Sequence, residues 1–577
     1  MTSSTAARRA LAGLLLVVLT ACGGLPVPSG VRDAAGVGGA APDVGGIVVV
    51  APGPQPGMTA VQVVQGFLYA LSRSPQDDHR IAKQFLAPDV ECCEAGEEAV
   101  LYPLGGVSPT LQEEEDSVVR ASFRSVGRIL RDGSFRLEGT DVRDDFGVVD
   151  VDGELRLSSV PRGLRLVVDD LERSYTAYDV HFLSTDVDGA PSGRLVPDRV
   201  FLPASREPGQ ALVDALLAGP TRRLAPAVLS AAPAGTTAEV DVAAGTVTVD
   251  LSEQAAALET RDRQRLAAQL VWTLVPAYSG VRVLVGGEPL VPDEDPVLDR
   301  SDWDEYDPSG TLSDPPLHYL QDRRLRSLDG GLGESAVTTG VLPVDGAAAS
   351  LSGTDLAVRT RRSAAVDEVR TGPLRGPFGE PVLTGPGLTS LSWGPGEQGL
   401  WVLQTRAPAG VWLVPPAGPG SRAPQRVPVQ TPQDAGPLSA LKVSRDGARI
   451  ALVLGGRLHV GRVEPSGGRW RIGDVTLVSR ELVGVTDVAW RSGTSLVALG
   501  AFEADGQLFP AEVAVDGSST AVVQRPLVGA VAREIAAAPR QPLVIAADVD
   551  DQRQLYDDDD DTLFRPLGPG RSPFYPG

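Results

Sequence analysis

The chain contains few lysine, cysteine, methionine and aromatic residues, and its net charge is strongly negative. Lysine occurs only at Lys83 and Lys442, and 74 acidic residues outweigh 52 basic ones in 577 residues, which gives a formal net charge of −22. No basic stripe is visible that could neutralise phosphates, so the composition argues against nucleic-acid binding. We interpret the acidity as a source of solubility rather than as a site for a cationic ligand.

The N-terminus also lacks a hydrophobic run long enough to span a membrane. The apolar segment 11–19 is far shorter than the roughly 20 residues that a transmembrane helix needs. It follows Arg8 and Arg9 and precedes small residues, which is the order of a signal peptide, predicted here over residues 1–21. Its removal would change the net charge from −22 to −24, because it carries two arginines and no acid.

Cys22 follows the small residues directly, in the string Leu19-Thr20-Ala21-Cys22. This segment resembles the bacterial lipobox, which implies cleavage before Cys22, diacylation of that cysteine and attachment to the outer face of the plasma membrane. Two acyl chains suffice for stable anchoring. The alternative is ordinary secretion with an accidental cysteine.

The remaining cysteines, Cys92 and Cys93, are adjacent. Adjacent residues have poor geometry for a disulfide, whose Cα atoms usually lie about 4.4 to 6.8 Å apart. We therefore expect two separate thiols, with a strained vicinal bridge as the alternative. The four histidines lie far apart in the sequence and show no zinc-type spacing.

The chain is long enough for several domains. Residues 22–57 are rich in glycine, alanine and proline and are predicted to be a flexible tether. An α+β domain is expected over residues 58–190. Thr59 would cap a helix with one apolar face, a second short helix would carry Ile81 and Phe85, and strands of period two would follow, with turns at Asp132-Gly133 and Asp152-Gly153.

A second, α/β domain is expected over residues 194–290. The segment 209–220 reads as a helix closed by Gly219, followed by strands 237–242 and 246–251, a helix 261–274 and a strand 281–285. Four blocks resemble the GerMN domain, a sporulation- and envelope-associated module: 216–220, 232–236, 245–252 and 269–274.

Residues 291–316 are predicted to be a linker and residues 317–577 a β-propeller. Five units of strand, polar turn and apolar strand recur with a period of roughly 45 to 50 residues, which is the length of a four-stranded blade. Residues 317–328 are a candidate for a further blade, so the blade number stays open. The fold class expected is thus a multidomain chain with an N-terminal α+β domain, an α/β GerMN-like domain and a C-terminal all-β propeller.

The lipobox and these three domains, in this order, resemble the actinobacterial lipoprotein LpqB family over essentially the whole mature chain. The resemblance implies an accessory protein that contacts the extracellular domain of the sensor histidine kinase MtrB and modulates the MtrA–MtrB two-component system, which is tied to cell-wall homeostasis and division. It supplies no catalytic residues, and only Cys22 carries over as a site. We therefore expect no enzyme and no cofactor or metal.

Other motifs have simpler explanations than chemistry. The string Gly394-Pro395-Gly396-Glu397-Gln398-Gly399 fits a dinucleotide fingerprint but lies between two predicted strands, where a turn is expected. Asp150 to Gly153 and Asp186 to Gly189 lack the ligands of a calcium loop, so turns are favoured there as well. The run Asp557 to Asp561 is interpreted as a solvated loop at the propeller edge rather than as a divalent-ion site.

Two aromatic features leave an alternative function open. Trp393, Trp401 and Trp490 could stack on sugars, which would make the protein a binder of peptidoglycan or another cell-wall glycan, although we favour core packing. The segment 303–308 combines acids and aromatics and is either a contact surface or an ordered linker packed on the propeller. No serine elbow or paired nucleophile and base is recognisable, so an envelope hydrolase is the least favoured function.

Overall fold

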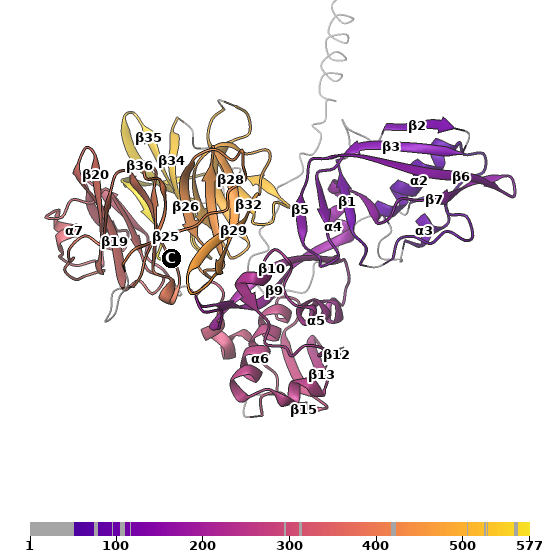
Figure 1. The fold of residues 1–577 in the computed structure, drawn as a ribbon, viewed down its shortest axis with the longest axis horizontal. Helices are drawn as coiled ribbons and strands as arrows, with labels where there is room; N and C mark the ends of the chain where they lie inside the picture. Colours follow the sequence, from indigo (N-terminus) through magenta and orange to yellow (C-terminus); the bar gives the residue numbers. More distant parts are fainter. Residues whose placement is uncertain are drawn as a thin grey trace, which may run out of the picture. The chain divides into compact units, whose positions relative to one another are not determined.

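The computed structural model describes residues 51–577 except 74–78, 95, 104–109, 116, 293–295, 311–313, 417–422, 505, 524–526, 528 and 559–562. Among these residues no helix is long and apolar enough to cross a membrane. Residues 51–174, 175–306 and 317–577 are called the first domain, the second domain and the propeller below (Figure 1).

The first domain begins with helix α2 (Ala60–Arg73), which starts where the sequence predicts. Thr59 and Gln62 form reciprocal bonds: the Thr59 hydroxyl accepts from the Gln62 amide at 3.3 Å, and the Gln62 side chain accepts from the Thr59 amide at 2.9 Å. The expected apolar stripe is buried, at Val63, Val64, Phe67, Leu68 and Leu71. The second helix, α3 (Arg80–Lys83), is only four residues long.

Two four-stranded sheets complete the first domain, in the orders β2-β3-β6-β7 and β5-β4-β1-β8, and α2 packs against strands of both. One strand departs from the expectation: along β6 the buried residues are Asp144, Phe146 and Val148, whereas Val149, in the predicted run 149–151, is 40% exposed. The strands are β1 (Ala99–Tyr102), β2 (Thr110–Glu115), β3 (Val118–Arg124), β4 (Gly127–Ile129), β5 (Phe135–Leu137), β6 (Asp141–Val151), β7 (Glu154–Ser159) and β8 (Leu164–Val167), followed by the short helices η3 (Val168–Asp170) and α4 (Leu171–Ser174).

The expected limits of the tether and of the first domain need correction. Ala51, inside the predicted tether, is buried in the core of the first domain. At the other end, the expected boundary at 190–194 falls within a hairpin of β9 (Tyr175–Thr185) and β10 (Pro191–Pro203), which pair from Tyr175 with Pro203 to Thr185 with Pro191. Because paired strands share a sheet, β9 belongs to the second domain.

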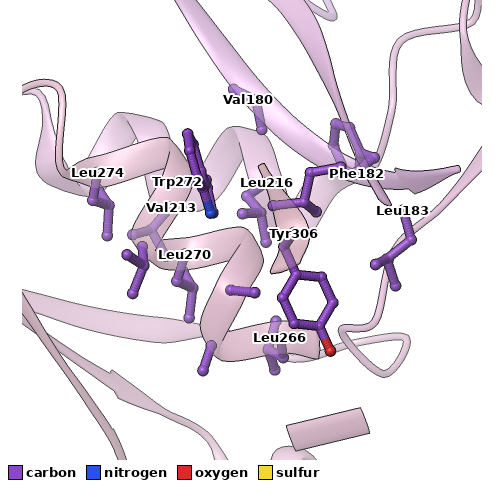
Figure 2. Close-up of a cluster of buried hydrophobic side chains, with 14 of the residues drawn as sticks. Val180, Phe182, Leu183, Val213, Leu216, Leu266, Leu270, Trp272, Leu274 and Tyr306 are labelled. Carbon is purple, nitrogen blue, oxygen red and sulfur yellow. The ribbon is translucent and has the colours of Figure 1, made fainter. Parts of the chain in front are cut away.

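The second domain contains two sheets, β10-β9-β11 and β12-β13-β14-β15, with β13 parallel to β14. Helix α5 (Gly209–Ala218) ends at Gly219 with a φ of 90°, and α6 (Thr260–Leu274) packs Leu266, Leu270 and Leu274 into the core shown in Figure 2. The other elements are β11 (Val228–Leu229), β12 (Ala238–Ala243), β13 (Thr246–Leu251), β14 (Gly280–Val285), β15 (Glu288–Pro289) and the short helices η4 (Ala225–Ala227) and η5 (Glu253–Ala257).

Part of the predicted linker 291–316 is also core. Helix η6 (Arg300–Tyr306) buries Trp303 and Tyr306 among the side chains of the second domain, and the carbonyl of Trp303 accepts a bond of 3.2 Å from the indole of Trp272 on α6. Figure 2 shows Tyr306 in this cluster. The two rings of the acidic and aromatic segment complete the core of the second domain, rather than pack as a linker on the propeller, while Asp304 and Glu305 stay exposed.

The C-terminal part is a propeller, as expected. Its described residues form six sheets: five of four strands, and one of three strands in the order β17-β16-β38. The last sheet joins residues 318–327 to strand β38 (Arg571–Phe574), so the candidate segment 317–328 does form a blade, closed by the end of the chain. Such closure pairs the first and last strands and leaves the ring without a free seam.

Within each of the five four-stranded sheets the blade strands run in sequence order. The strands of the propeller that precede β38 are β16 (His318–Gln321), β17 (Arg324–Ser327), β18 (Gly346–Ala349), β19 (Asp355–Ser363), β20 (Val366–Pro373), β21 (Leu383–Gly385), β22 (Leu388–Trp393), β23 (Leu400–Gln404), β24 (Gly410–Val414), β25 (Gln425–Val427), β26 (Leu438–Val443), β27 (Arg449–Leu454), β28 (Arg457–Pro465), β29 (Trp470–Leu477), β30 (Val483–Trp490), β31 (Ser495–Ala501), β32 (Phe509–Ala514), β33 (Thr520–Val522), β34 (Val531–Ala536), β35 (Val544–Val549), β36 (Gln552–Asp557) and β37 (Arg565–Pro569), with short helices α7 (Ala336–Thr339) and η7 (Gly396–Gln398) between them.

Candidate functional site: the junction of the second domain and the propeller

The residue predicted to carry the lipid, Cys22, and the signal segment lie outside the described residues. The structure does describe Cys92 and Cys93 and joins them in a vicinal disulfide, with Cys93 in the left-handed region at φ 68°. This differs from the expectation of two separate thiols. Sequence spacing does not reveal this backbone conformation at Cys93.

The glycine string and the acidic loops are turns, as predicted. Residues 394–399 join β22 to β23 through η7. The Asp150 carboxylate accepts from the Gly153 amide at 2.8 Å, and the Asp186 carboxylate accepts from the amides of Asp188 and Ala190. The carboxylates of Asp150 and Asp186 therefore accept hydrogen bonds from the backbone of the turns in which they lie.

The acidic run is not a uniformly solvated loop. Asp557 is buried and forms an ion pair of 2.7 Å with Arg565, while a carboxylate oxygen of Asp558 accepts from the Leu543 amide at 2.6 Å. Asp559, Asp560 and Asp561 lie outside the described residues. Among the described residues, no group of three histidine, cysteine or acidic side chains could hold a metal ion.

The tryptophans and histidines that sequence singled out are mostly core residues. Trp401 is fully buried and Trp490 is 4% exposed, while the indole of the partly buried Trp393 donates to the Ala348 carbonyl at 2.9 Å. All four histidines are buried, and burial lowers the pKa of His181 to about 3 and that of His318 to about 4. Both imidazoles are therefore neutral at ordinary pH and enclosed by packing.

The most polar buried region lies where the second domain meets the propeller. Asp198 on β10 is 4% exposed and accepts two bonds from Thr221, one from its amide at 2.7 Å and one from its hydroxyl at 3.1 Å. Burial raises the pKa of Asp198 to about 6, and the positive charge of Arg449, from the propeller, opposes the rise. A buried carboxylate at a domain boundary needs such partners, because an unpaired charge there is costly.

Arg449, at the start of β27, is the propeller's main contribution to this junction. It is 7% exposed and donates to the carbonyl of Pro197 at 2.6 Å. The turn before it, residues 444–448, is held by Asp446, whose carboxylate accepts from the Ser444 hydroxyl at 2.5 Å and the Ala448 amide at 2.8 Å. This turn places Ala448 in the hydrophobic core of the second domain. The blade therefore inserts an apolar side chain and a cation into its neighbour.

A second arginine makes the reverse connection, from the second domain to the propeller. Arg223 donates to the carbonyl of Asp516 at 3.2 Å and to the hydroxyl of Thr476, and its own carbonyl accepts from Arg462 at 2.7 Å. The hydroxyl of Thr494 adds a bond of 3.2 Å to the carboxylate of Asp179 on β9. Desolvation raises the pKa of this carboxylate. Both partners thus contribute charged groups that are satisfied across the boundary.

The junction binds the two domains together and leaves little room for a ligand. The cavity that it encloses, lined by Asp198, Arg223 and Arg449 among others, has a volume of about 30 Å³. That is enough for about one or two water molecules and far below the several hundred Å³ of typical ligand sites. Sequence reasoning missed this region because its partners lie far apart in the chain, 252 residues in the case of Arg449 and Pro197.

Comparison with known proteins agrees with this architecture. Three family models match in order: "Lipoprotein LpqB, N-terminal domain" at residues 53–172, "Sporulation and spore germination" at 179–291 and "Lipoprotein LpqB beta-propeller domain" at 311–576. Lipoprotein LpqB of Thermobifida fusca is 31% identical over 98% of this chain and 97% of its own length. The chain belongs to the lipoprotein LpqB family. Lipoprotein LpqB of Cutibacterium acnes is 28% identical over 89% of each chain.

Solved structures resemble separate parts of this LpqB family member. TolB from Acinetobacter baumannii matches at 13% identity with a TM-score of 0.35, over 59% of this chain and 82% of its own. The first GerMN domain of the sporulation protein GerM from Bacillus subtilis matches at 24% identity with a TM-score of 0.18, over 22% of this chain and 98% of its own. The predicted membership of the LpqB family is confirmed by the relatives that span nearly the whole chain.

Proposed function

We propose that this chain is a membrane-anchored accessory lipoprotein that binds the extracellular domain of an MtrB-like sensor histidine kinase and modulates its signalling in cell-wall homeostasis and division. Cys22 carries the lipid, and the folded part lies on the extracytoplasmic face. The protein acts by binding and has no catalytic activity. The observation that supports this most strongly is the LpqB relationship over 98% of the chain, with all three domains in order.

The interior of the molecule is consistent with a binding role. Its buried charges at the junction are engaged in fixing one domain against another, and the cavity there is too small for a substrate. The described histidines are enclosed, so none is available as an exposed general base. A chain built in this way can present outer surfaces in a fixed arrangement to a partner protein.

Crosslinking in living cells followed by mass spectrometry tests the proposal. The native chain is compared with the Cys22→Ala variant, which lacks the site of lipidation, and both are expressed to the same level. We expect the sensor ectodomain to be captured by the native chain and to be captured less by the variant, since the anchor raises local concentration. Absence of the sensor from the native sample, together with unchanged signalling on deletion of the gene, would overturn it.

Binding of peptidoglycan or another cell-wall glycan is the competing function. It was suggested by Trp393, Trp401 and Trp490, but two of these rings are buried and the third is bonded to a neighbouring blade. No exposed aromatic platform remains at these three positions. Capture of glycan fragments in the same crosslinking experiment, without the sensor, would favour this function over the accessory role.

A further inference from the structure

A groove in the first domain collects arginine side chains that the junction does not use. It has a volume of about 520 Å³ and is lined mainly by the β4–β5 hairpin, with Arg222 of the second domain on its rim. Arg128 lies on β4, Arg131 in the turn and Arg136 on β5. In a chain with 74 acids and 52 basic residues, four arginines in one groove are a local reversal of charge.

The pairing of the hairpin makes this arrangement unfavourable for the fold alone. Arg128 and Arg136 are directly opposite each other in the antiparallel register of β4 and β5. Like charges at opposed positions destabilise a sheet, whereas opposite charges or aromatic pairs stabilise it. The pairing of β4 with β5 therefore gives no reason for a second arginine at position 136. A ligand of opposite charge would give such a reason.

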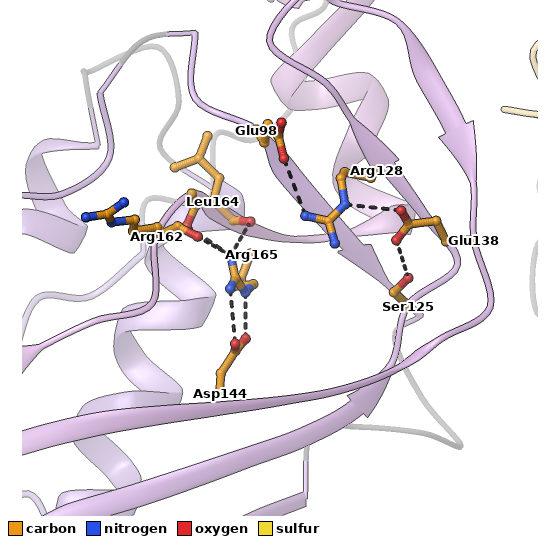
Figure 3. Close-up of polar contacts among 9 residues, drawn as sticks. Glu98, Ser125, Arg128, Glu138, Asp144, Arg162, Leu164 and Arg165 are labelled. Atoms are coloured by element: carbon orange, nitrogen blue, oxygen red, sulfur yellow. Dashed lines mark hydrogen bonds and ion pairs between the residues drawn. The ribbon is translucent and has the colours of Figure 1, made fainter.

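Two of the three acidic side chains of the groove, Glu98 and Glu138, form ion pairs, and both pair with the same arginine, Arg128. Figure 3 shows Arg128 between Glu138 and Glu98, at 3.2 and 3.5 Å, with Ser125 donating to Glu138. The third acid, Asp132, accepts bonds from Ser134 and from the Arg222 amide. Among the contacts of the described residues, none involves the guanidinium groups of the three exposed arginines, Arg131, Arg136 and Arg222.

The figure also shows what a structural arginine in this domain looks like. Arg165 is 7% exposed and forms two parallel bonds to the Asp144 carboxylate, at 2.6 and 3.1 Å, and it donates to backbone carbonyls as well. Its donors are occupied by the protein itself. The groove arginines present the same forked donors outward, and such donors match the two oxygens of a carboxylate.

We propose that this groove is the docking site for an acidic segment of the partner, in which Asp or Glu carboxylates bind Arg131, Arg136 and Arg222. This inference rests on the proposed function, because the partner is the sensor's extracellular domain. A concave site of this size accommodates an extended chain, whereas a planar bilayer surface cannot enter it. The net negative charge of the whole chain does not prevent this binding, since charges more than about 8 Å apart are largely screened at physiological ionic strength.

The test uses the full-length lipidated chain in detergent and the soluble sensor ectodomain. The double variant Arg131→Glu/Arg136→Glu is compared with Arg206→Glu/Arg406→Glu, which makes the same change in charge at exposed positions outside the groove. We expect the groove variant to bind the ectodomain roughly ten- to a hundredfold more weakly and the control to bind within about twofold of wild type. Wild-type affinity should fall with added salt, and thermal unfolding of all three proteins should coincide.

Each outcome separates this inference from the proposed function. If wild type and both variants bind equally well, the groove is not the docking site and the accessory role stands. If the wild-type chain does not bind the ectodomain, the accessory role fails, and a hexaglutamate peptide then tests the groove. Binding of this peptide to wild type but not to the groove variant supports the groove as a site for acidic segments. No binding of the peptide to wild type overturns that inference. Binding to phosphatidylglycerol vesicles without binding to the peptide would overturn the proposed occupant.

Discussion

Two sets of arginines, at the domain junction and in the groove, use the same side chain for opposite purposes. At the junction, Arg449 and Arg223 are enclosed, and their guanidinium groups donate to carbonyls or hydroxyls of the neighbouring domain. In the groove, Arg131 and Arg136 are exposed and Arg136 faces another arginine across the sheet. The difference indicates that the first set holds the two domains together, whereas the guanidinium groups of the second set are not used by the fold in this way.

Removing the junction cation should produce the largest effect. Arg449→Ala leaves the buried Asp198 and Asp446 without their shared cation, and loss of one partner from a buried charge pair typically destabilises by about 3 to 5 kcal/mol. Urea unfolding followed by tryptophan fluorescence measures the change, with Arg406→Ala as an exposed control expected within about 0.5 kcal/mol of wild type. Equal stability of the two variants would remove the contrast between the two sets.

The junction should also respond to pH in a direction set by Asp198. Its pKa in the folded protein is about 6, above the value of about 3.9 expected for an unfolded chain. Between these values the folded state holds a proton that the unfolded state has lost, so this group favours folding at low pH and the contribution disappears as pH rises through about 6.

The Asp198→Asn variant isolates that contribution. The stability of wild type minus that of the variant should fall by on the order of 2 kcal/mol between pH 4 and pH 7. Asp487, a half-buried propeller carboxylate whose pKa is also raised to about 6 by desolvation, provides a matched variant, Asp487→Asn, away from the junction. Proteolysis between the second domain and the propeller is then followed against pH. If its rate changes with pH in wild type and in Asp487→Asn but not in Asp198→Asn, the pH dependence arises at the junction. If the difference in stability between wild type and Asp198→Asn does not change with pH, the assignment of this pH dependence to Asp198 is wrong.

The smallest effect on stability is expected in the groove. Arg136→Gln removes one member of a like-charged cross-strand pair, so the free energy of unfolding should stay constant or rise by up to about 0.5 kcal/mol. The same urea experiment measures it beside Arg449→Ala. A loss above about 1 kcal/mol would mean that Arg136 is a structural residue like Arg165, and the contrast between the two sets would then fail.

Local sequence signals predicted the elements that depend on local chemistry. The stop at Gly219, the apolar face of α6 and the capped start of α2 each involve residues within a few positions of one another. The turn at Asp132-Gly133 was predicted as well, but the register around it was not. Counting outward from a two-residue turn would place Ile129 opposite Arg136, whereas the structure pairs Arg128 with Arg136.

The features that sequence did not predict depend on distant partners or on unusual backbone. The expected boundary at 190–194 divided the β9–β10 hairpin, while the pairing that contradicts this boundary involves the whole length of both strands. Trp303 and Tyr306 looked like linker residues, since the surface that buries them, which includes α6 and β10, forms only when the domain folds. Residues 317–328 were a candidate for a further blade, but the partner strand β38 lies some 250 residues away, and no periodic pattern predicts that partner.

The pairing of β16 with β38 also has a consequence for how the protein is made. On one edge of β16, residue 318 pairs with residue 574, so the ring stays open until the end of the chain has been synthesised. The first two domains contain their own sheets and can fold earlier, and contacts between residues so distant in sequence form slowly. The open ring would expose strand edges during this interval, so the chain is prone to aggregation until the last blade closes.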